Sequence, residues 1–194
     1  TMHVVIVKYN AGNIRSVDFA LQRIGVQAEI TDDFATIRRA DKVIFPGVGE
    51  AGTTMRYLKE HGLDVLLSEL QQPLLGICLG QQLMCKWSEE GDTPCIGIFD
   101  QMVYRFLPGL KIPHMGWNKL ENKTGVLFHG LEEESYVYFV HSYYVPVNEH
   151  TAASCRYGTE FSAALQQGNF YATQFHPEKS GAVGQKILEN FLAL

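Results

Sequence analysis

The stretch PLLGICLGQQLM, residues 73–84, decides the fold of this chain, because it changes its character around a cysteine. Its apolar run, Leu74–Ile77, is typical of a buried strand, and the polar, helix-favouring residues that close it predict a helix. Cys78 lies between Gly76 and Gly80, the spacing of a nucleophile elbow. A sharp strand-to-helix turn leaves no room for side chains at those two positions. The stretch therefore predicts a tight turn with an exposed cysteine at its apex.

Short apolar runs alternate with helical periodicity through the first half of the chain. Strands are predicted at residues 4–7, 28–31, 42–45 and 74–77. Helices are predicted over 14–24, over 55–70 with an interruption at Gly62, and over 80–87. Asn13 can cap the first of these helices, and Gly25 can end it. This alternation implies parallel strands, and strands that are apolar on both faces require helices on both sides of the sheet.

The second half of the chain has a different sequence pattern. Runs that look like hairpin strands occur at residues 103–106, 136–140, 152–155, 161–166 and 170–175, and a last helix is predicted from about Ser180. No linker, repeat or low-complexity segment interrupts the sequence. We therefore expect one α/β domain over residues 1–194. Its central sheet should be open and mostly parallel (flavodoxin-like), flanked by helices, with antiparallel strands in the second half.

Composition and charge narrow the class of protein. Apolar residues make up 46% of the chain and charged residues 19%, a globular balance, and the net charge of −5 lacks the basic footprint of a nucleic-acid binder. No run approaches the ~18 apolar residues of a membrane span. The first residues lack the features of a signal peptide, and the four cysteines form no C-x-x-C pair. We expect a cytosolic protein with free thiols, no metal site, and neither a membrane nor a nucleic-acid partner.

Cys78 is the candidate nucleophile. Ligands of open α/β sheets gather beyond the carboxyl ends of the strands, where this residue falls. A thiolate at a helix N-terminus is stabilised by unpaired N–H groups. A buried structural cysteine beside turn glycines is the alternative interpretation of the pentapeptide alone. The other cysteines, Cys85, Cys95 and Cys155, have no such frame and are interpreted as structural.

The stretch QFHPE, residues 174–178, supplies a candidate base and its orienting group. His176 and Glu178 are two positions apart in extended chain, so their side chains can face the same way. The carboxylate can bond one imidazole nitrogen and leave the other facing the thiol. Alone, the tripeptide is typical of a polar turn with a solvated glutamate. Together with the elbow, it favours a catalytic site built from cysteine, histidine and glutamate.

The loop GVGEAG, residues 47–52, has two interpretations. It matches the G-x-G-x-x-G fingerprint of dinucleotide loops, but such loops normally follow the first strand, and Glu50 would place negative charge near a pyrophosphate. Alternatively, its glycines free a backbone N–H of Val48 or Gly49. With the N–H of Leu79, that group could hold the oxyanion formed when a thiolate attacks a carbonyl. We prefer the second interpretation and expect no cofactor.

Together these motifs resemble the class I glutamine amidotransferase family. GICLGQQL resembles its nucleophile motif, QFHPEKS its histidine–glutamate motif and FPGVG its oxyanion strand, in the family's order along the chain. The resemblance implies that Cys78 attacks the side-chain amide carbon of L-glutamine and that His176, oriented by Glu178, protonates the departing ammonia. Water then hydrolyses the thioester and releases glutamate. The resemblance also implies that glutamine is held near Gly49 by Gln82, Ser142 and Tyr143.

Further stretches resemble one branch of that family, the glutaminase subunits of imidazole glycerol phosphate synthase: YNAGNIRSV, PGVGEAG, PHMGWN and YFVHSY. The stretch Lys8-Tyr9-Asn10 departs from the aspartate that many relatives carry there, which leaves the contacts of this loop open. The resemblance implies a separate (β/α)₈ cyclase subunit that uses the ammonia in histidine biosynthesis. Positions in stretches that resemble the family's partner-facing surface are His114, Trp117, Asn118, Tyr138 and Lys179.

Other hypotheses stay open at this point. The chain could be the glutaminase subunit of another amidotransferase, a stand-alone cysteine hydrolase or peptidase, a redox protein with a dinucleotide in its glycine loop, or a catalytically silent regulatory subunit. We also expect weak glutaminase activity without the partner, because the flexible glycine loop can turn an N–H group away from the site until docking reorients it.

Overall fold

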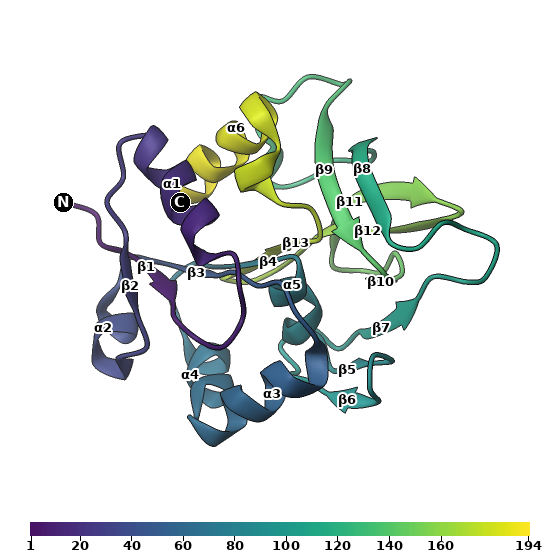
Figure 1. Ribbon diagram of the computed structural model, residues 1–194. Helices are drawn as coiled ribbons and strands as arrows, with labels where there is room; N and C mark the ends of the chain where they lie inside the picture. The colour runs from purple at the N-terminus through teal and green to yellow at the C-terminus, as the bar shows by residue number, and fades with distance from the viewer.

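Seven strands form the central sheet in the order β11-β12-β13-β4-β3-β1-β2 in the computed structural model, which describes residues 1–194 (Figure 1). Five of them run parallel: β1 (Val4–Val7), β2 (Glu29–Thr31), β3 (Lys42–Phe45), β4 (Leu74–Ile77) and β13 (Phe170–Thr173). The antiparallel edge consists of β12 (Thr159–Gln167) and β11 (Thr151–Tyr157). The prediction of an open, mostly parallel sheet with antiparallel strands in the second half is confirmed.

Helices cover both faces of the sheet (Figure 1). On one face lie α1 (Ile14–Arg23) and α6 (Gly181–Leu192); on the other lie α2 (Phe34–Arg39), α3 (Ala51–Glu60), α4 (Leu63–Glu69) and α5 (Leu79–Met84). Successive strand residues point to opposite faces. Val4 and Ile6 therefore pack under the first group of helices, whereas Val5 and Val7 pack under the second.

Two smaller sheets lie beside the antiparallel edge, at the right of Figure 1. One pairs β8 (His114–Lys119) with β9 (Tyr136–His141). The other contains β10 (Tyr143–Tyr144), β7 (Met102–Arg105), β5 (Trp87–Ser88) and β6 (Thr93–Pro94). Short 3₁₀ turns span Val126–Phe128 and Pro177–Lys179. No helix combines the length and the apolar character needed to cross a bilayer.

Several local predictions were wrong. The helix predicted over 80–87 ends at Met84, because Trp87 and Ser88 pair with Met102 and Val103 in a strand. The helix α2 and the strands β5, β6 and β8 were not predicted. Asn13 occupies the position before α1, but its side chain makes no capping bond to the helix.

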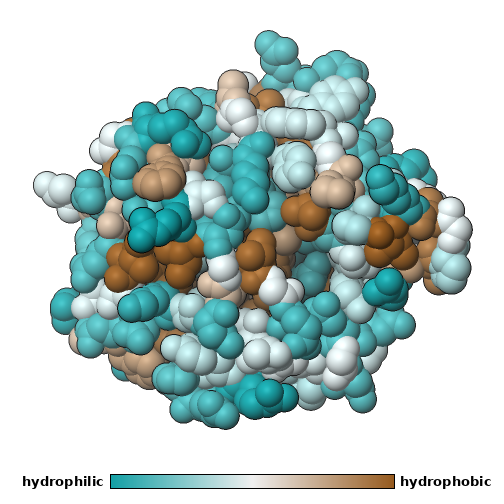
Figure 2. Space-filling view, in the orientation of Figure 1, coloured by the Kyte–Doolittle hydropathy of each residue, from teal (hydrophilic) through white to brown (hydrophobic).

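The carboxyl ends of three adjacent strands build one edge of the sheet. The loop of Gly47 to Gly49 follows β3, Cys78 follows β4, and the segment with His176 follows β13. Because β4 is hydrogen-bonded between the other two in parallel, all three segments leave the sheet at the same edge. Hydrophobic side chains reach the surface in a band across one face at the level of this sheet (Figure 2).

Candidate active site

Cys78 lies at the turn from β4 into α5 with φ 56° and ψ −110°, a conformation that side chains rarely adopt. The flanking glycines are required by contact. A Cβ on Gly76 would overlap the Met84 sulfur, and a Cβ on Gly80 would overlap the Phe45 carbonyl oxygen. This is the crowding that the sequence predicts for an elbow. The residue is nevertheless buried rather than exposed, since only 6% of its surface is accessible.

His176 and Glu178 form a buried pair next to this cysteine. Nδ1 of His176 lies 2.8 Å from Oε2 of Glu178, and neither side chain is exposed. The same carboxylate oxygen accepts a hydrogen bond of 2.9 Å from Nδ2 of Asn13. Asn13 was predicted as a helix cap. Its Nδ2 instead donates to the carboxylate. The cap is absent because its Oδ1, the atom that would accept from the helix, accepts from the Ser16 hydroxyl, and because its φ of 75° is not the extended conformation of a capping residue.

The protonation of His176 follows from its neighbours. Burial alone would lower the pKa of His176, but the adjacent Cys78 thiol and the Glu178 carboxylate outweigh burial and raise that pKa to about 10. Glu178 uses Nδ1, so Nε2 is the nitrogen left for the thiol, and it is buried without a hydrogen-bond partner of its own. An imidazolium in this position stabilises a neighbouring thiolate.

Backbone bonds fix the His176 segment to β9. The N–H of His176 donates to the Tyr138 carbonyl oxygen at 3.0 Å. The Ser180 hydroxyl donates to the His176 carbonyl at 2.6 Å and accepts from the N–H of Tyr138 at 2.9 Å. The base is therefore attached to a strand that also borders the thiol.

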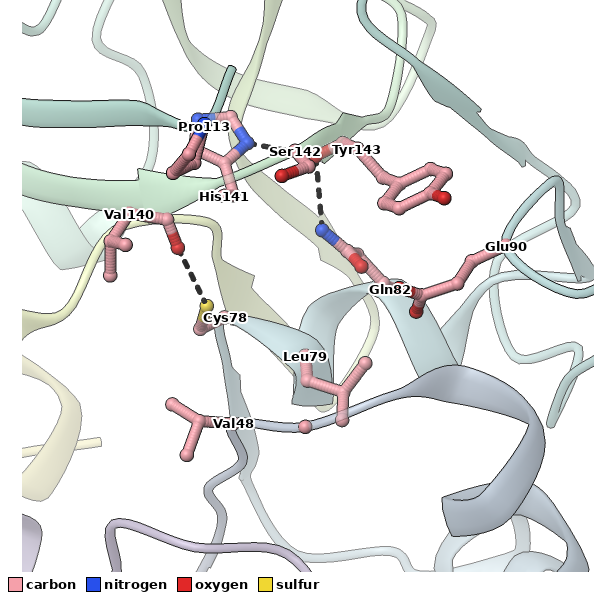
Figure 3. Close-up of a pocket in the computed structure, with 11 residues that line it drawn as sticks. Val48, Cys78, Leu79, Gln82, Glu90, Pro113, Val140, His141, Ser142 and Tyr143 are labelled. Atoms are coloured by element: carbon pink, nitrogen blue, oxygen red, sulfur yellow. Dashed lines mark hydrogen bonds between the residues drawn. The ribbon is translucent and has the colours of Figure 1, made fainter.

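Two further groups contact the thiol, and sequence analysis missed both. The Cys78 Sγ lies 3.8 Å from the Val140 carbonyl oxygen, a contact drawn in Figure 3, and 3.8 Å from Nε2 of the fully buried Gln174. Gln174 belongs to the QFHPE stretch, so its position could have been noticed. Val140 had no signal in the sequence.

A pocket of about 290 Å³ opens above Cys78 (Figure 3). All of the predicted glutamine contacts and oxyanion positions line it, namely Val48, Gly49, Leu79, Gln82, Ser142 and Tyr143. Glu90, Pro113, Val140 and His141 also line it and were not predicted. The structure thus brings these six positions together with Cys78 around one pocket, and the role of each residue stays a prediction.

One polar atom of Gln82, its Oε1, has no hydrogen-bond partner in the protein. Its Nε2 donates to the Tyr143 carbonyl at 3.0 Å and to Oε1 of Gln174 at 3.1 Å, so both amide hydrogens are used. No group of the protein donates to its Oε1, which leaves an acceptor for a ligand with N–H groups.

Glu90 brings a carboxylate to the pocket wall. Its Oε1 accepts a hydrogen bond of 2.9 Å from the N–H of Ala51, and burial raises its pKa above the usual value. A half-buried carboxylate that lacks a paired cation suits an ammonium group on a ligand. Glu90 escaped sequence analysis because it lies in a loop with no recognisable motif.

One of the predicted oxyanion donors is occupied in this structure, and a second is turned away. The N–H of Leu79 donates to the Gly47 carbonyl oxygen at 3.2 Å, so that carbonyl fills the place where an oxyanion would sit. The carbonyl and N–H of one peptide point in opposite directions. The N–H of Val48, which shares the peptide with the Gly47 carbonyl, is therefore turned away. The Val48 carbonyl is held by the N–H of Gly12 at 3.3 Å.

The dinucleotide interpretation of the glycine loop finds no support in the N-terminus of α3. The Glu50 carboxylate accepts from the N–H groups of Gly52 and Thr53, at 2.7 and 3.1 Å, and Glu90 accepts from Ala51. The N–H groups that would bind a pyrophosphate are thus already occupied by carboxylates of the chain.

The positions predicted to face a partner divide into two groups. Trp117 is 56% exposed, and Lys179 is exposed as well. Tyr138 is half-buried and its ring lies 6.0 Å from that of Trp117, edge to face, while Asn118 is half-buried next to them. His114 differs from the prediction because its side chain is buried, with 4% of the residue accessible, and does not reach the surface.

The fold and this site define the class of protein. The family model for class I glutamine amidotransferases matches residues 6–194, so the chain belongs to the class I glutamine amidotransferase family. The fold resembles that of a chain in the structure of PurLQS from Thermotoga maritima, with a TM-score of 0.74 at 16% identity over 99% of this chain and 98% of that chain.

The particular relatives are more specific. The chain is 61% identical to the imidazole glycerol phosphate synthase subunit HisH of Bacteroides fragilis, over the full length of both chains. It is 45% identical to the HisH subunit of Vibrio cholerae, again over the full length of both.

Proposed function

We propose that this amidotransferase is the glutaminase subunit of an imidazole glycerol phosphate synthase in histidine biosynthesis. It hydrolyses L-glutamine to glutamate and ammonia, and it delivers the ammonia to a (β/α)₈ cyclase subunit with which it forms a heterodimer. The observation that carries the proposal is the position of Cys78 in the pocket and next to the buried His176–Glu178 pair, in a chain that matches HisH subunits along its whole length. Its four free cysteines support a cytoplasmic location.

Catalysis proceeds through a thioester. The Cys78 thiolate attacks the amide carbon of the glutamine side chain, and His176 gives the proton on Nε2 to the departing ammonia. Glu178 keeps Nδ1 protonated and the ring oriented, in the 2.8 Å contact described above. A water then attacks the thioester carbon, His176 takes its proton as general base, and glutamate leaves with the thiolate restored.

Glutamine is recognised by groups of opposite character. The free Oε1 of Gln82 accepts from N–H groups, and the Glu90 carboxylate pairs with the α-ammonium group. Ser142 and Tyr143 form the facing wall.

The resting site is poorly suited to stabilise an oxyanion. Rotation of the Gly47–Val48 peptide would remove the carbonyl from the N–H of Leu79 and present the N–H of Val48 instead. This rotation changes ψ of Gly47 and φ of Val48, and a glycine at the first of these positions gives the backbone the freedom it needs. We expect docking of the cyclase to favour the rotated peptide, and therefore weak glutaminase activity in the isolated chain.

The β8–β9 pair is the surface proposed to meet the cyclase. Trp117 is the exposed aromatic anchor, with Tyr138, Asn118 and Lys179 beside it. Because the N–H of His176 is bonded to the Tyr138 carbonyl, this surface lies directly behind the catalytic base.

The test mixes the purified chain with candidate barrel cyclases. A one-to-one complex whose hydrolysis of glutamine rises when the nucleotide ligand of the cyclase is added supports the proposal. Release of ammonia from glutamine but no cleavage of peptides separates it from a stand-alone hydrolase. An isolated chain as fast as the complex would contradict the resting-state argument, and unchanged activity in Cys78→Ala would remove the catalytic assignment.

A further inference from the structure

Two buried histidines next to the pocket take no part in the mechanism above. His114 on β8 and His141 on β9 stand opposite each other in the strand pair, and Nδ1 of His114 lies 2.9 Å from Nε2 of His141. Both are buried, at 4% and 6% accessible surface. Only His141 lines the pocket.

His141, the histidine that lines the pocket, fixes the direction of the hydrogen bonds in this pair. Nδ1 of His141 lies 2.8 Å from the Tyr143 carbonyl oxygen, which can only accept, so this nitrogen carries the proton. Burial lowers the pKa of His141 to about 3, so the ring is neutral and its Nε2 is an acceptor. Nδ1 of His114 must therefore be the donor.

The same reasoning extends the chain outward. Burial lowers the pKa of His114 to about 4, so this ring is also neutral and its Nε2 accepts. The donor is Nδ2 of Asn118, 3.3 Å away. The orientation of that amide is set because its Oδ1 accepts from the N–H of Lys119 at 2.8 Å and its Nδ2 also donates to the Arg156 carbonyl at 3.1 Å.

The inner end of the chain is the wall of the pocket. The Tyr143 carbonyl that accepts from His141 also accepts from Nε2 of Gln82, and both bonds are drawn in Figure 3. Gln82 is bonded in turn to Gln174, whose Nε2 lies 3.8 Å from the Cys78 sulfur. An unbroken series of hydrogen bonds thus joins the half-buried Asn118 to the nucleophile.

We propose that His114 and His141 are positioning residues that hold the Tyr143 carbonyl, and through it the Gln82 amide, in the orientation that binds glutamine. This inference rests on the proposed glutaminase function and deepens it. The outer end, Asn118, lies next to Trp117 in the surface proposed for the cyclase, so the partner touches the same series of bonds that orients the substrate amide.

The substitution His114→Phe tests the proposal. A phenyl ring keeps the stacking on Tyr157 and Phe139, whose centroids lie 4.1 and 4.9 Å from that of His114, and removes both hydrogen bonds. In the complex with the cyclase, we expect the KM for glutamine to rise about tenfold with kcat changed less than about twofold, a loss of binding within the range of one buried hydrogen bond. His114→Asn, which retains a donor near Nδ1, should recover part of the loss.

A matched control separates positioning from loss of packing. Phe139→Leu disturbs the same cluster without touching the hydrogen bonds and should lower the melting temperature while leaving KM unchanged. In a Gln82→Ala background, His114→Phe should have no further effect on KM, because the group through which it acts is gone. Equal changes in KM for Phe139→Leu, or additive changes in the double variant, would overturn the proposal.

A second measurement uses the unmodified chain. Nitrogen-15 spectra of the imidazoles at neutral pH should show both His114 and His141 protonated at Nδ1, and a ring protonated at Nε2 would contradict the series of bonds. If the unmodified complex releases no ammonia from glutamine, the proposed function fails. If it does and His114→Phe leaves KM unchanged, only the positioning role fails.

Discussion

Cys78 stores conformational strain at the reactive atom. Its φ of 56° combined with ψ of −110° is a region that glycine enters freely and other residues do not, with a cost of order 1–3 kcal/mol. The conformation persists because β4 is paired on both sides and α5 begins at the next residue. In this conformation the thiol lies between the Val140 carbonyl and Gln174.

This strain can be measured with two inactive variants. Cys78→Ala and Cys78→Gly both remove the thiol, but only glycine relieves the strained backbone. We expect Cys78→Gly to be more stable than Cys78→Ala by about 1–2 kcal/mol in urea unfolding, against the usual preference for alanine over glycine. An alanine variant that is more stable by the usual margin of about 0.5–1 kcal/mol would show that the elbow is not strained.

At the scale of the elements, the start of α1 is adapted to the site. Asn13 has a φ of 75° and gives up the capping bond to its own helix. Its Nδ2 reaches Glu178, a residue near the other end of the chain, so α1 and the turn after β13 are linked through the catalytic carboxylate. Asn13 thus orients the catalytic carboxylate from the start of a ten-residue helix that has no side-chain cap.

Asn13 therefore offers a test of the carboxylate. Asn13→Asp replaces a donor with an acceptor and places a second negative charge against Glu178, which weakens its hold on the His176 ring. We expect kcat of the complex to fall by about tenfold or more in Asn13→Asp and by less in Asn13→Ala. If kcat falls further in Asn13→Ala than in Asn13→Asp, repulsion between the two carboxylates is not the cause of the loss.

The elements that were predicted well are those whose own residues determine them. The strands at 4–7 and 74–77 are continuous runs without polar side chains, the strand at 42–45 has three apolar residues after Lys42, and the structure gives the same bounds for all three. By contrast, α2 buries only Ile37 and left a weak periodicity, although the Asp33 carboxylate that caps it at the N–H of Thr36 was a usable signal. The strand β8 contains Gly116 and half-exposed polar residues, so only its pairing with β9 defines it.

The candidate site divides in the same way. Cys78, His176 and Glu178 carry recognisable spacing and were found from the sequence. Glu90 and Val140 enter the pocket from elements whose positions depend on tertiary packing, so no local pattern could indicate them.

At the scale of the whole molecule, buried histidines make stability depend on pH in two directions. His114 and His141 have pKa values of about 4 and about 3, lowered by burial, below the value near 6.5 of an unfolded chain. His141 faces His114 and His176, which also oppose a positive charge on it. The raised pKa of His176 has the opposite effect on stability. Its contribution to the free energy of unfolding is complete below pH 6.5 and is lost as the pH rises toward 10.

Below pH 6.5 the two neutral histidines should therefore dominate. The unfolded chain binds protons that the folded chain does not, so the free energy of unfolding should fall as the pH is lowered from 6 to 5. Urea unfolding at the two pH values measures this slope. His114→Phe removes one of the two groups and should show a shallower slope, whereas an equal or steeper slope in that variant would contradict the assignment of neutral, buried rings.

The adjacency of β3, β4 and β13 has a consequence for how such a chain can change over generations. The separation of the reactive groups follows from the spacing of roughly 4.8 Å between hydrogen-bonded strands, which no single side chain can alter. Residues of the helices that flank the sheet can therefore be replaced while the distances between the catalytic groups stay the same. A Thermotoga maritima chain with only 16% of its residues in common can consequently share this scaffold, and diversification should be concentrated in the loops and docking faces that decide where the ammonia goes.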